Sequence, residues 1–227
     1  MASVKVLGAP QSPYVNRVQI ALNLKSVDYE FLEMQFRPKS ELLLKSNPVH
    51  KKVPVMIHGE KPICESLIIV QYIDEVWTNC PNILPSDPYD RAMARFWGVY
   101  VDEWFPLMMG FRNTVGEEAK AATLEKVLEG IMRLEDAFAE CSKGKDFFSG
   151  DTIGYIDIAF GSCIGWISAI EMITNEKLLD ETKTPGLFRW AKKFISNAAV
   201  KDVILETMVL VDVIRKYDAR ANTQVVS

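Results

Sequence analysis

The chain has 227 residues and a mass of 25.7 kDa, with 48% hydrophobic and 25% charged residues, which excludes a disordered or collagen-like chain. Lysine and arginine number 26 against 30 aspartates and glutamates, so the chain lacks the basic excess of a nucleic-acid-binding protein. The length allows one or two domains, and a chain of this size buries about 70% of its surface, enough for a core without disulfides.

Few residues are suited to metal binding or disulfide chemistry. The cysteines, Cys64, Cys80, Cys141 and Cys163, form neither a C-x-x-C motif nor a zinc-binding spacing, and there are only two histidines. The N-terminus lacks the apolar core of a signal peptide, and no window approaches the roughly 20 apolar residues of a membrane span. We therefore expect a cytosolic protein with reduced thiols, no metal, and no membrane or nucleic-acid partner.

The first part of the chain predicts a small α/β unit. Short apolar or alternating runs predict strands, and apolar residues at helical spacing predict helices. In chain order the predicted elements are a strand at 4–7, a helix at 14–25, a strand at 29–34, strands at 53–57 and 62–64 around a glycine-containing turn, and a helix at 66–77. The strand–helix–strand order implies a right-handed crossover between two parallel strands.

Residues 79–88 contain three prolines and no periodicity, which predicts a linker. Everything beyond it is helical in pattern, with predicted helices at 89–114, 117–141, 154–170, 185–197 and 200–217. Pro106 is expected to kink or end the first of these helices. The nearly uncharged stretch 154–170 is expected to be the buried central helix. The predicted organisation is therefore a domain at 1–78, a linker at 79–88 and an all-helical domain at 89–227.

Ser12 stands where the first predicted strand passes into the first helix, and Pro13 suits that helix's first turn. One interpretation is that Ser12 is only an N-cap, a role for which serine is favoured. Another is that its hydroxyl, together with the positive end of the helix dipole, stabilises an anion of a bound molecule such as a thiolate. Tyr14 is a rival donor, or an aromatic side chain lining a groove.

Two further sites combine a structural and a ligand-binding interpretation. Pro54 either simply opens a strand or follows a cis bond that leaves the backbone of Val53 free to pair with a peptide-like ligand. Glu65 and Ser66 begin a helix. Ser66 is suited to cap it and Glu65 to interact with its dipole, but the pair could also bind an amino acid, with Glu65 at the ammonium and Ser66 at the carboxylate. Lys39, Lys51 and Lys52 are either solvated charges or partners for a ligand carboxylate.

The chain resembles the plant tau class of cytosolic glutathione transferases along its whole length. The stretches that carry the resemblance are Ser12-Pro13-Tyr14 with Arg17, residues 47–55 (NPVHKKVPV), residues 61–66 (KPICES) and residues 84–89 (LPSDPY). The resemblance implies a thioredoxin-like α/β N-terminal domain, an all-α C-terminal domain, a homodimer, and glutathione as co-substrate with no separate cofactor.

The resemblance also implies roles for individual residues. Ser12 matches the serine that hydrogen-bonds the glutathione sulfur, and the other glutathione-binding positions are Lys39, Lys52, Val53, Glu65 and Ser66. The positions implied for the hydrophobic electrophile pocket are Tyr14, Arg17, Met109, Trp166, Leu210 and Ile214. This chain departs from the class at Pro10, where a tryptophan is usual, and at Pro106, Gly110 and Asn113, where aromatic or basic residues are common. Met108, Met109 and Phe111 are expected to supply a softer apolar wall instead.

The family's usual signature at the start of the buried helix is a Ser or Thr cap followed by Asp at the third helical position. This chain keeps the acid as Asp157 and has Gly154 in place of the cap, as tau-class members often do, and Asp157 is expected to bond the cap's backbone N–H. The activity implied is conjugation of glutathione to hydrophobic electrophiles in detoxification and stress responses, with glutathione-dependent hydroperoxide reduction as a second activity. The alternative is a non-catalytic carrier of large apolar ligands, which would not need Ser12. A disulfide reductase is disfavoured because the active-site position holds serine.

Overall fold

The computed structural model describes residues 2–35 and 38–225, with side chains as far as Ala219. Its first part is a four-stranded sheet in the order β2-β1-β3-β4. The strands are β1 (Val4–Gly8), β2 (Glu30–Glu33), β3 (Val55–His58) and β4 (Lys61–Cys64). β1 runs parallel to β2 and antiparallel to β3, and β3 and β4 form a hairpin. The predicted crossover and hairpin are both confirmed.

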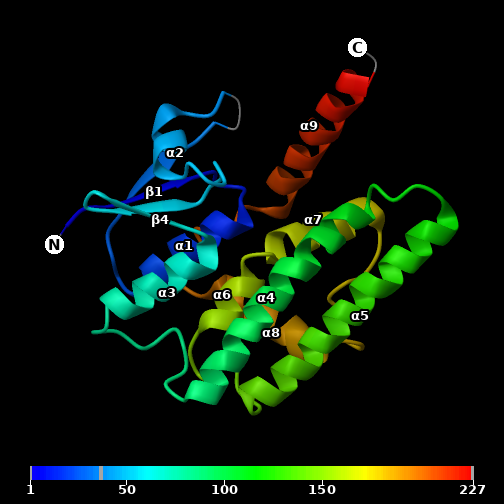
Figure 1. The fold of residues 1–227 in the computed structure, drawn as a ribbon. Helices are drawn as coiled ribbons and strands as arrows, with labels where there is room; N and C mark the ends of the chain where they lie inside the picture. The colour runs from blue at the N-terminus through cyan, green and yellow to red at the C-terminus, as the bar shows by residue number, and fades with distance from the viewer. Residues whose placement is uncertain (1, 36–37, 226–227) are drawn as a thin grey trace.

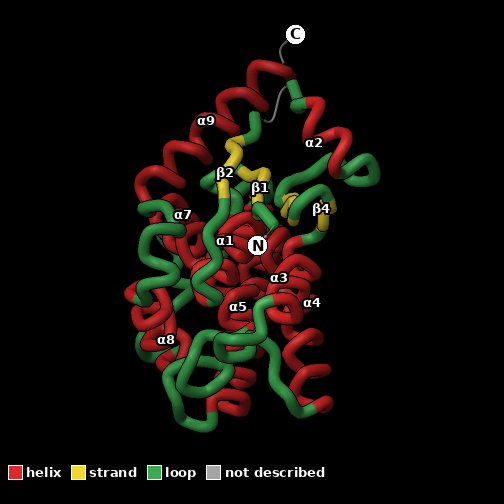
Figure 2. Tube along the Cα trace, turned by 90° about the vertical axis from the view of Figure 1, so that its left-hand side faces the viewer, coloured by secondary structure: helices red, strands yellow, loops and turns green. Residues whose placement is uncertain are grey.

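Alternate residues of the strands face different helices, as the two-residue period of a strand requires. Val6 and Met56 belong to the large core that includes the buried side chains of α1 (Pro13–Leu24) and α3 (Ser66–Val76). Leu7 and Val55 instead pack with Leu43 of α2 (Glu41–Ser46). Figures 1 and 2 accordingly show α2 on the side of the sheet away from α1 and α3. α2 was not predicted, because six residues are too few to display a helical period.

The second part of the chain is helical, as predicted. Its helices are α4 (Pro88–Phe111), α5 (Glu117–Ser142), α6 (Tyr155–Gly161), α7 (Ile164–Thr174), α8 (Pro185–Ser196) and α9 (Thr207–Val225). The long helices α4 and α5 lie side by side, and α9 packs on α7 (Figure 1). The helical domain meets the small domain mainly where α1 approaches α6.

Pro106 does not end α4, which continues to Phe111. Proline removes one backbone hydrogen bond from a helix interior, but burial of neighbouring side chains offsets that loss. Phe105 and Met108 are 6% and 0% exposed, so the turn around Pro106 is held against the core.

The predicted helix at 154–170 is two helices, broken at Ser162 and Cys163. The Ala159 carbonyl, which would accept the Cys163 amide in a continuous helix, accepts the Arg17 guanidinium at 2.9 Å instead. The Cys163 amide bonds the Phe160 carbonyl at 2.9 Å, which tightens the chain and ends α6. The Ser162 hydroxyl donates to the same Ala159 carbonyl at 3.1 Å, so this acceptor is occupied by one local donor and by one that lies 142 residues away.

The predicted helix at 200–217 begins seven residues later, at Thr207, because residues 200–206 form turns. In the described part of the chain, Tyr155–Thr174 is the one stretch apolar and long enough to cross a membrane, and 78% of that window is buried inside the protein. It spans the break between α6 and α7 and forms the centre of the helical domain, as expected for a core segment.

A buried ion pair fixes the segment between α3 and α4. The ammonium of Lys25 lies 2.8 Å from Asp74 Oδ1 with no exposed side-chain surface, and it also donates to the Pro81 carbonyl at 2.9 Å. Asp74 accepts the backbone amides of Ile83 and Leu84 at 2.8 and 2.9 Å. Each buried charge thus has several partners, which a buried ion pair needs in order to offset its desolvation.

Asp157, at the start of α6, is completely buried and organises the loop before it. Its carboxylate accepts four N–H groups: the amides of Phe148, Ser149 and Gly154, and the Trp190 indole at 2.7 Å. The expected bond to the cap's backbone is therefore confirmed. Gly154 is also required sterically, because a Cβ there would lie 1.8 Å from Ser149 Oγ. Burial raises the pKa of Asp157 to about 6, and the four donors limit the rise, so the group is ionised at neutral pH.

We predict that Asp157→Ala lowers the free energy of unfolding by about 3–5 kcal/mol, because it leaves four buried donors without an acceptor. Urea unfolding at pH 7.5 measures the change. Asp151→Ala is the matched control, since Asp151 is an exposed acid in the same loop, paired only with Lys145. Equal losses in the two variants would show that the buried network is not what stabilises this region.

Candidate active site

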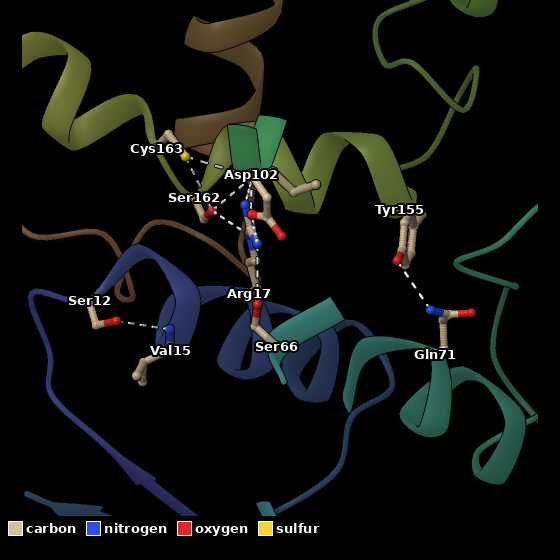
Figure 3. A network of polar contacts seen from close by, with 10 residues as sticks. Ser12, Val15, Arg17, Ser66, Gln71, Asp102, Tyr155, Ser162 and Cys163 are labelled. Atoms are coloured by element: carbon tan, nitrogen blue, oxygen red, sulfur yellow. Dashed lines mark hydrogen bonds and ion pairs between the residues drawn. The ribbon is translucent and has the colours of Figure 1, made fainter. Parts of the chain in front are cut away.

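Ser12 is the N-cap of α1, and its hydroxyl oxygen accepts the Val15 amide at 3.4 Å (Figure 3). The capping interpretation is therefore correct as far as it goes. The bond is long, and it uses only a lone pair of the hydroxyl, so the hydroxyl proton remains able to donate. A partly exposed donor at the positive end of a twelve-residue helix is suited to an anion.

Tyr14 lies two residues after Ser12 and is half-buried, with its ring edge-on to Phe105 at a centroid distance of 6.1 Å. Burial raises the pKa of the Tyr14 phenol above its usual value, although Arg17 opposes the rise. The phenol is therefore neutral at physiological pH. It can serve as a hydrogen-bond donor or an aromatic wall, but not as a base.

The backbone is unusual at two places beside the β3–β4 hairpin, just before β3 and between β4 and α3. The Val53–Pro54 bond is cis, so that of the two interpretations of Pro54 the cis one is confirmed. Glu65 has φ 69° and ψ 118°, a conformation that side-chain-bearing residues rarely adopt, and it lies exposed at the N-cap of α3. Strain of this kind persists where surrounding structure demands it and is common at binding sites. Its carboxylate lies 3.8 Å from His50 Nε2, an exposed and therefore weak pair.

Ser66 is connected to a buried arginine. Arg17 Nη1 donates to Ser66 Oγ at 3.2 Å and to Asp102 Oδ1 at 2.7 Å (Figure 3). Its other nitrogens donate to the Ala159 carbonyl and to Ser162 Oγ. Because the guanidinium supplies a donor to Ser66, that hydroxyl is left to donate its own proton onward to a ligand.

Arg17 therefore does not line a pocket, contrary to expectation. Its side chain is 0% exposed, and its guanidinium carbon lies 5.0 Å from the centre of the Tyr14 ring, behind it. A cation this buried has to be fully hydrogen-bonded, and the donors of Arg17 are spent on protein acceptors.

The lysines are solvent-exposed. Lys39 Nζ donates to the Lys51 carbonyl at 2.9 Å, which folds its side chain back on the loop that precedes the cis bond. Lys52 lies beside Val53, and its carbonyl accepts the side-chain amide of Asn47 at 3.0 Å. Both ammonium groups are available to an anionic ligand.

The other residues expected in the electrophile pocket come from α4, α7 and α9. Met109 is half-buried, whereas Trp166, Leu210 and Ile214 are 7%, 2% and 2% exposed. Met108 and Phe111 have no exposed surface, so the expectation that they form a pocket wall is wrong. They occupy the core-facing side of α4, while Pro106 and Gly110 are exposed on that helix and Asn113 is exposed just beyond its end.

Several contacts of the site were not predicted. Asp102, the partner of Arg17, carries no motif. The indole of Trp166 donates to the Gln11 carbonyl at 2.8 Å, across 155 residues of sequence. Arg112 at the end of α4 pairs with Asp218 of α9 at 2.6 Å. For a contact such as that of Asp102, the sequence signal is weak: a polar residue among apolar residues on one face of a helix.

Comparison with known proteins agrees with this architecture. Residues 2–75 match the family model described as glutathione S-transferase, N-terminal domain, and residues 93–198 match the corresponding C-terminal domain. Glutathione S-transferase U17 of Arabidopsis thaliana is 55% identical over 217 residues, covering 95% of this chain and 96% of that protein.

Solved structures extend the agreement to three dimensions. A tau-class glutathione S-transferase from mango, Mangifera indica, is 56% identical with a TM-score of 0.92, covering 94% of this chain and 97% of the other. Rice GST1, solved in complex with glutathione, is 29% identical with a TM-score of 0.88, covering 96% and 97%. A thioredoxin-like sheet domain followed by a helical domain is the architecture of a cytosolic glutathione transferase. The chain belongs to the glutathione S-transferase family, and within it to the tau class.

Proposed function

We propose that the protein conjugates the thiolate of reduced glutathione to hydrophobic electrophiles, with Ser12 as the hydrogen-bond donor to the sulfur. The observation that carries this proposal is the position of Ser12: a partly exposed hydroxyl at the N-terminus of α1 whose proton is not used by its capping bond. The similarity to rice GST1, which was solved with glutathione, supports glutathione as the thiol.

The required stabilisation is within reach of this arrangement. A free thiol with a pKa of about 8.5 is only about 3% thiolate at pH 7, and lowering the pKa by about two units requires about 2.7 kcal/mol. A hydroxyl bond to a charged acceptor supplies about 1.5–3 kcal/mol, and a helix dipole about 0.3–1 kcal/mol.

A less basic thiolate is also a weaker nucleophile. With a Brønsted slope of about 0.45, a lowering of about two units costs about 8-fold in reactivity against a gain of about 25-fold in thiolate. Most of the acceleration therefore comes from holding the thiolate and the electrophile together, which makes the hydrophobic pocket as important as Ser12.

The remaining glutathione contacts follow from the charges and backbone of the small domain. We place the ammonium group of the γ-glutamyl residue at Glu65 and the α-carboxylate of the same γ-glutamyl residue at Ser66. Because Arg17 donates to the Ser66 hydroxyl oxygen, the hydroxyl proton of Ser66 is free to donate to that carboxylate. The backbone of Val53, beside the cis bond, pairs with the cysteinyl part, and Lys39 and Lys52 face the glycyl carboxylate. Glutathione is a co-substrate, so this chemistry needs no resident cofactor.

Apolar compounds fit the second half of the site best. Tyr14 and Met109 are half-buried and offer ring and thioether surface with few polar groups. Trp166, Leu210 and Ile214 are buried in the core against which this pair packs. Organic hydroperoxides of similar polarity are a second substrate class. A passive carrier would not need the hydroxyl of Ser12, and the relatives named above are transferases by name.

We also infer a cytosolic homodimer. Ile68 on α3 and Phe96 and Val99 on α4 are each more than half exposed, at 54%, 54% and 56%. Trp97 and Tyr100 lie half-buried beside them, and the rings of Phe96 and Trp97 are 5.1 Å apart. Apolar residues gathered on neighbouring helices are suited to a second copy of the chain.

Ser12→Ala is expected to raise the kinetic pKa of bound glutathione and to lower kcat about 10- to 1000-fold, as removal of an oxyanion donor does. Tyr14→Phe is the matched control, because it deletes a neighbouring hydroxyl and is expected to change mainly the KM for the electrophile. The pH dependence of kcat/KM measures both. If Tyr14→Phe removes the low pKa while Ser12→Ala retains it, the phenol is the donor and our assignment is wrong.

Glu65→Ala is expected to raise the KM for glutathione about 10- to 100-fold with little change in kcat, because its carboxylate is placed far from the sulfur. Glu60→Ala in the β3–β4 turn is the control for loss of an exposed acid near the same sheet. Steady-state kinetics with glutathione varied separates the two constants. A sharp fall in kcat at unchanged KM contradicts this placement.

Light scattering at micromolar concentration is expected to give a mass of about twice 25.7 kDa. Phe96→Glu, which places a charge on the proposed contact, is expected to shift the protein toward the monomer mass. A monomer mass for the unaltered protein refutes the dimer.

A further inference from the structure

The short segment from Ala9 to Ser12 sets the position of the Ser12 hydroxyl, and the backbone carbonyl of each of its residues accepts a hydrogen bond. The Ser12 amide donates to the Ala9 carbonyl at 2.9 Å, and the Asn16 side-chain amide donates to the Pro10 carbonyl at 3.3 Å. The shortest contact is the one from the Trp166 indole to the Gln11 carbonyl, at 2.8 Å. It comes from the other domain.

The side-chain cap of Ser12 does not fix its hydroxyl by itself. At 3.4 Å, the Ser12 Oγ to Val15 amide contact is near the limit of a hydrogen bond, whereas a good amide bond is about 2.9 Å. The direction of the hydroxyl therefore depends on the backbone that carries it, and the neighbouring peptide group is the one that Trp166 holds.

Trp166 lies on α7, the helix that packs on α9. It is 7% exposed on α7, and the residue before it, Gly165, brings α7 and α9 close together. A Cβ on Gly165 would lie 2.8 Å from Leu210 Cδ1 and 3.0 Å from Ile204 Cγ2. Gly165 and Leu210 are therefore closely packed, so a displacement of α9 would also displace α7 and Trp166.

We propose that Trp166 is a positioning residue for thiolate stabilisation: its indole N–H holds the Gln11 carbonyl and thereby aims the Ser12 hydroxyl at the sulfur. This inference rests on the proposed function of Ser12. It adds that the helical domain, which shapes the electrophile site, also sets how well the small domain activates glutathione. A displacement of about 1 Å at a reacting group costs up to about 100-fold in rate, so a single fixed peptide matters.

The test is Trp166→Phe, which removes the N–H and keeps most of the ring. Trp104→Phe is the matched control. The Trp104 side chain is also buried, at 3% exposed, and its indole N–H also donates to a backbone carbonyl, but that carbonyl is Val127 of the helical domain, at 3.1 Å. We expect Trp166→Phe to raise the pKa of bound glutathione by about 0.5–1 unit and to lower kcat about 3- to 10-fold, with the KM for glutathione within about twofold. Thiolate absorbance in the ultraviolet, titrated against pH, reads out the pKa directly, and Trp104→Phe should leave it unchanged.

The effect must also depend on Ser12. In a Ser12→Ala background, Trp166→Phe should produce no further change in the pKa of bound glutathione. If Ser12→Ala raises that pKa but Trp166→Phe does not, or if the two effects add, the positioning role is overturned while the role of Ser12 stands. If Ser12→Ala leaves the pKa unchanged, the proposed function fails first and the inference fails with it.

Replacement of the Trp166 side chain by 3-benzothienylalanine keeps the full bicyclic ring and exchanges only the N–H for sulfur. It covers the case in which phenylalanine does not support folding. The same rise in the pKa of bound glutathione is expected, and an unchanged pKa in this variant refutes the proposal.

Discussion

The buried guanidinium of Arg17 is the interaction on which the two domains and the site jointly depend. It lies at the seam where α1 meets α6, and it bonds Ser66 of the small domain together with Ala159, Ser162 and Asp102 of the helical domain. A cation with no exposed surface is tolerated only when its donors are satisfied. That requirement fixes α1, α3, α4 and α6 relative to one another, and it places two of the acceptors, Ala159 and Ser162, at the break between α6 and α7.

The site combines a fixed part with an adjustable part. The fixed part is built from backbone features: the start of α1 at Ser12, the cis bond after Val53 and the left-handed backbone of Glu65. The adjustable part is built from partly exposed side chains, Tyr14 on α1 and Met109 on α4. Because thiolate formation alone accelerates the reaction only a few-fold at neutral pH, the side chains that hold the electrophile matter as much as the thiol site.

Local patterns were enough to predict the crossover, the hairpin, the linker and the long helices, because each leaves a period or a turn signal in the sequence. The motifs around Ser12, Pro54 and Glu65 left structural and ligand-binding interpretations open, and the family resemblance is what pointed to glutathione. Arg17 was expected in the pocket from the resemblance, and Met108 and Phe111 from their position near it; all three are buried, because neither the resemblance nor a helical stripe says which face of a helix meets the core. The hydrogen bond of Trp166 to Gln11 and the ion pair of Arg17 with Asp102 join residues 155 and 85 positions apart, and no local signal specifies such partners.

The anchoring of the linker by Lys25 and Asp74 bears on how the two domains could be recombined. Lys25 and Asp74 belong to the small domain, but they bind only backbone groups of the linker, at Pro81, Ile83 and Leu84. The Ile83 carbonyl in turn accepts the Tyr155 amide, again through backbone alone. A helical domain from another tau-class protein joined after Leu84 would therefore keep the same backbone anchor. It would also have to supply the partners that Asp102, Ala159, Ser162 and Trp166 give to Arg17 and Gln11, so the exchange of an electrophile pocket carries the Ser12 site with it.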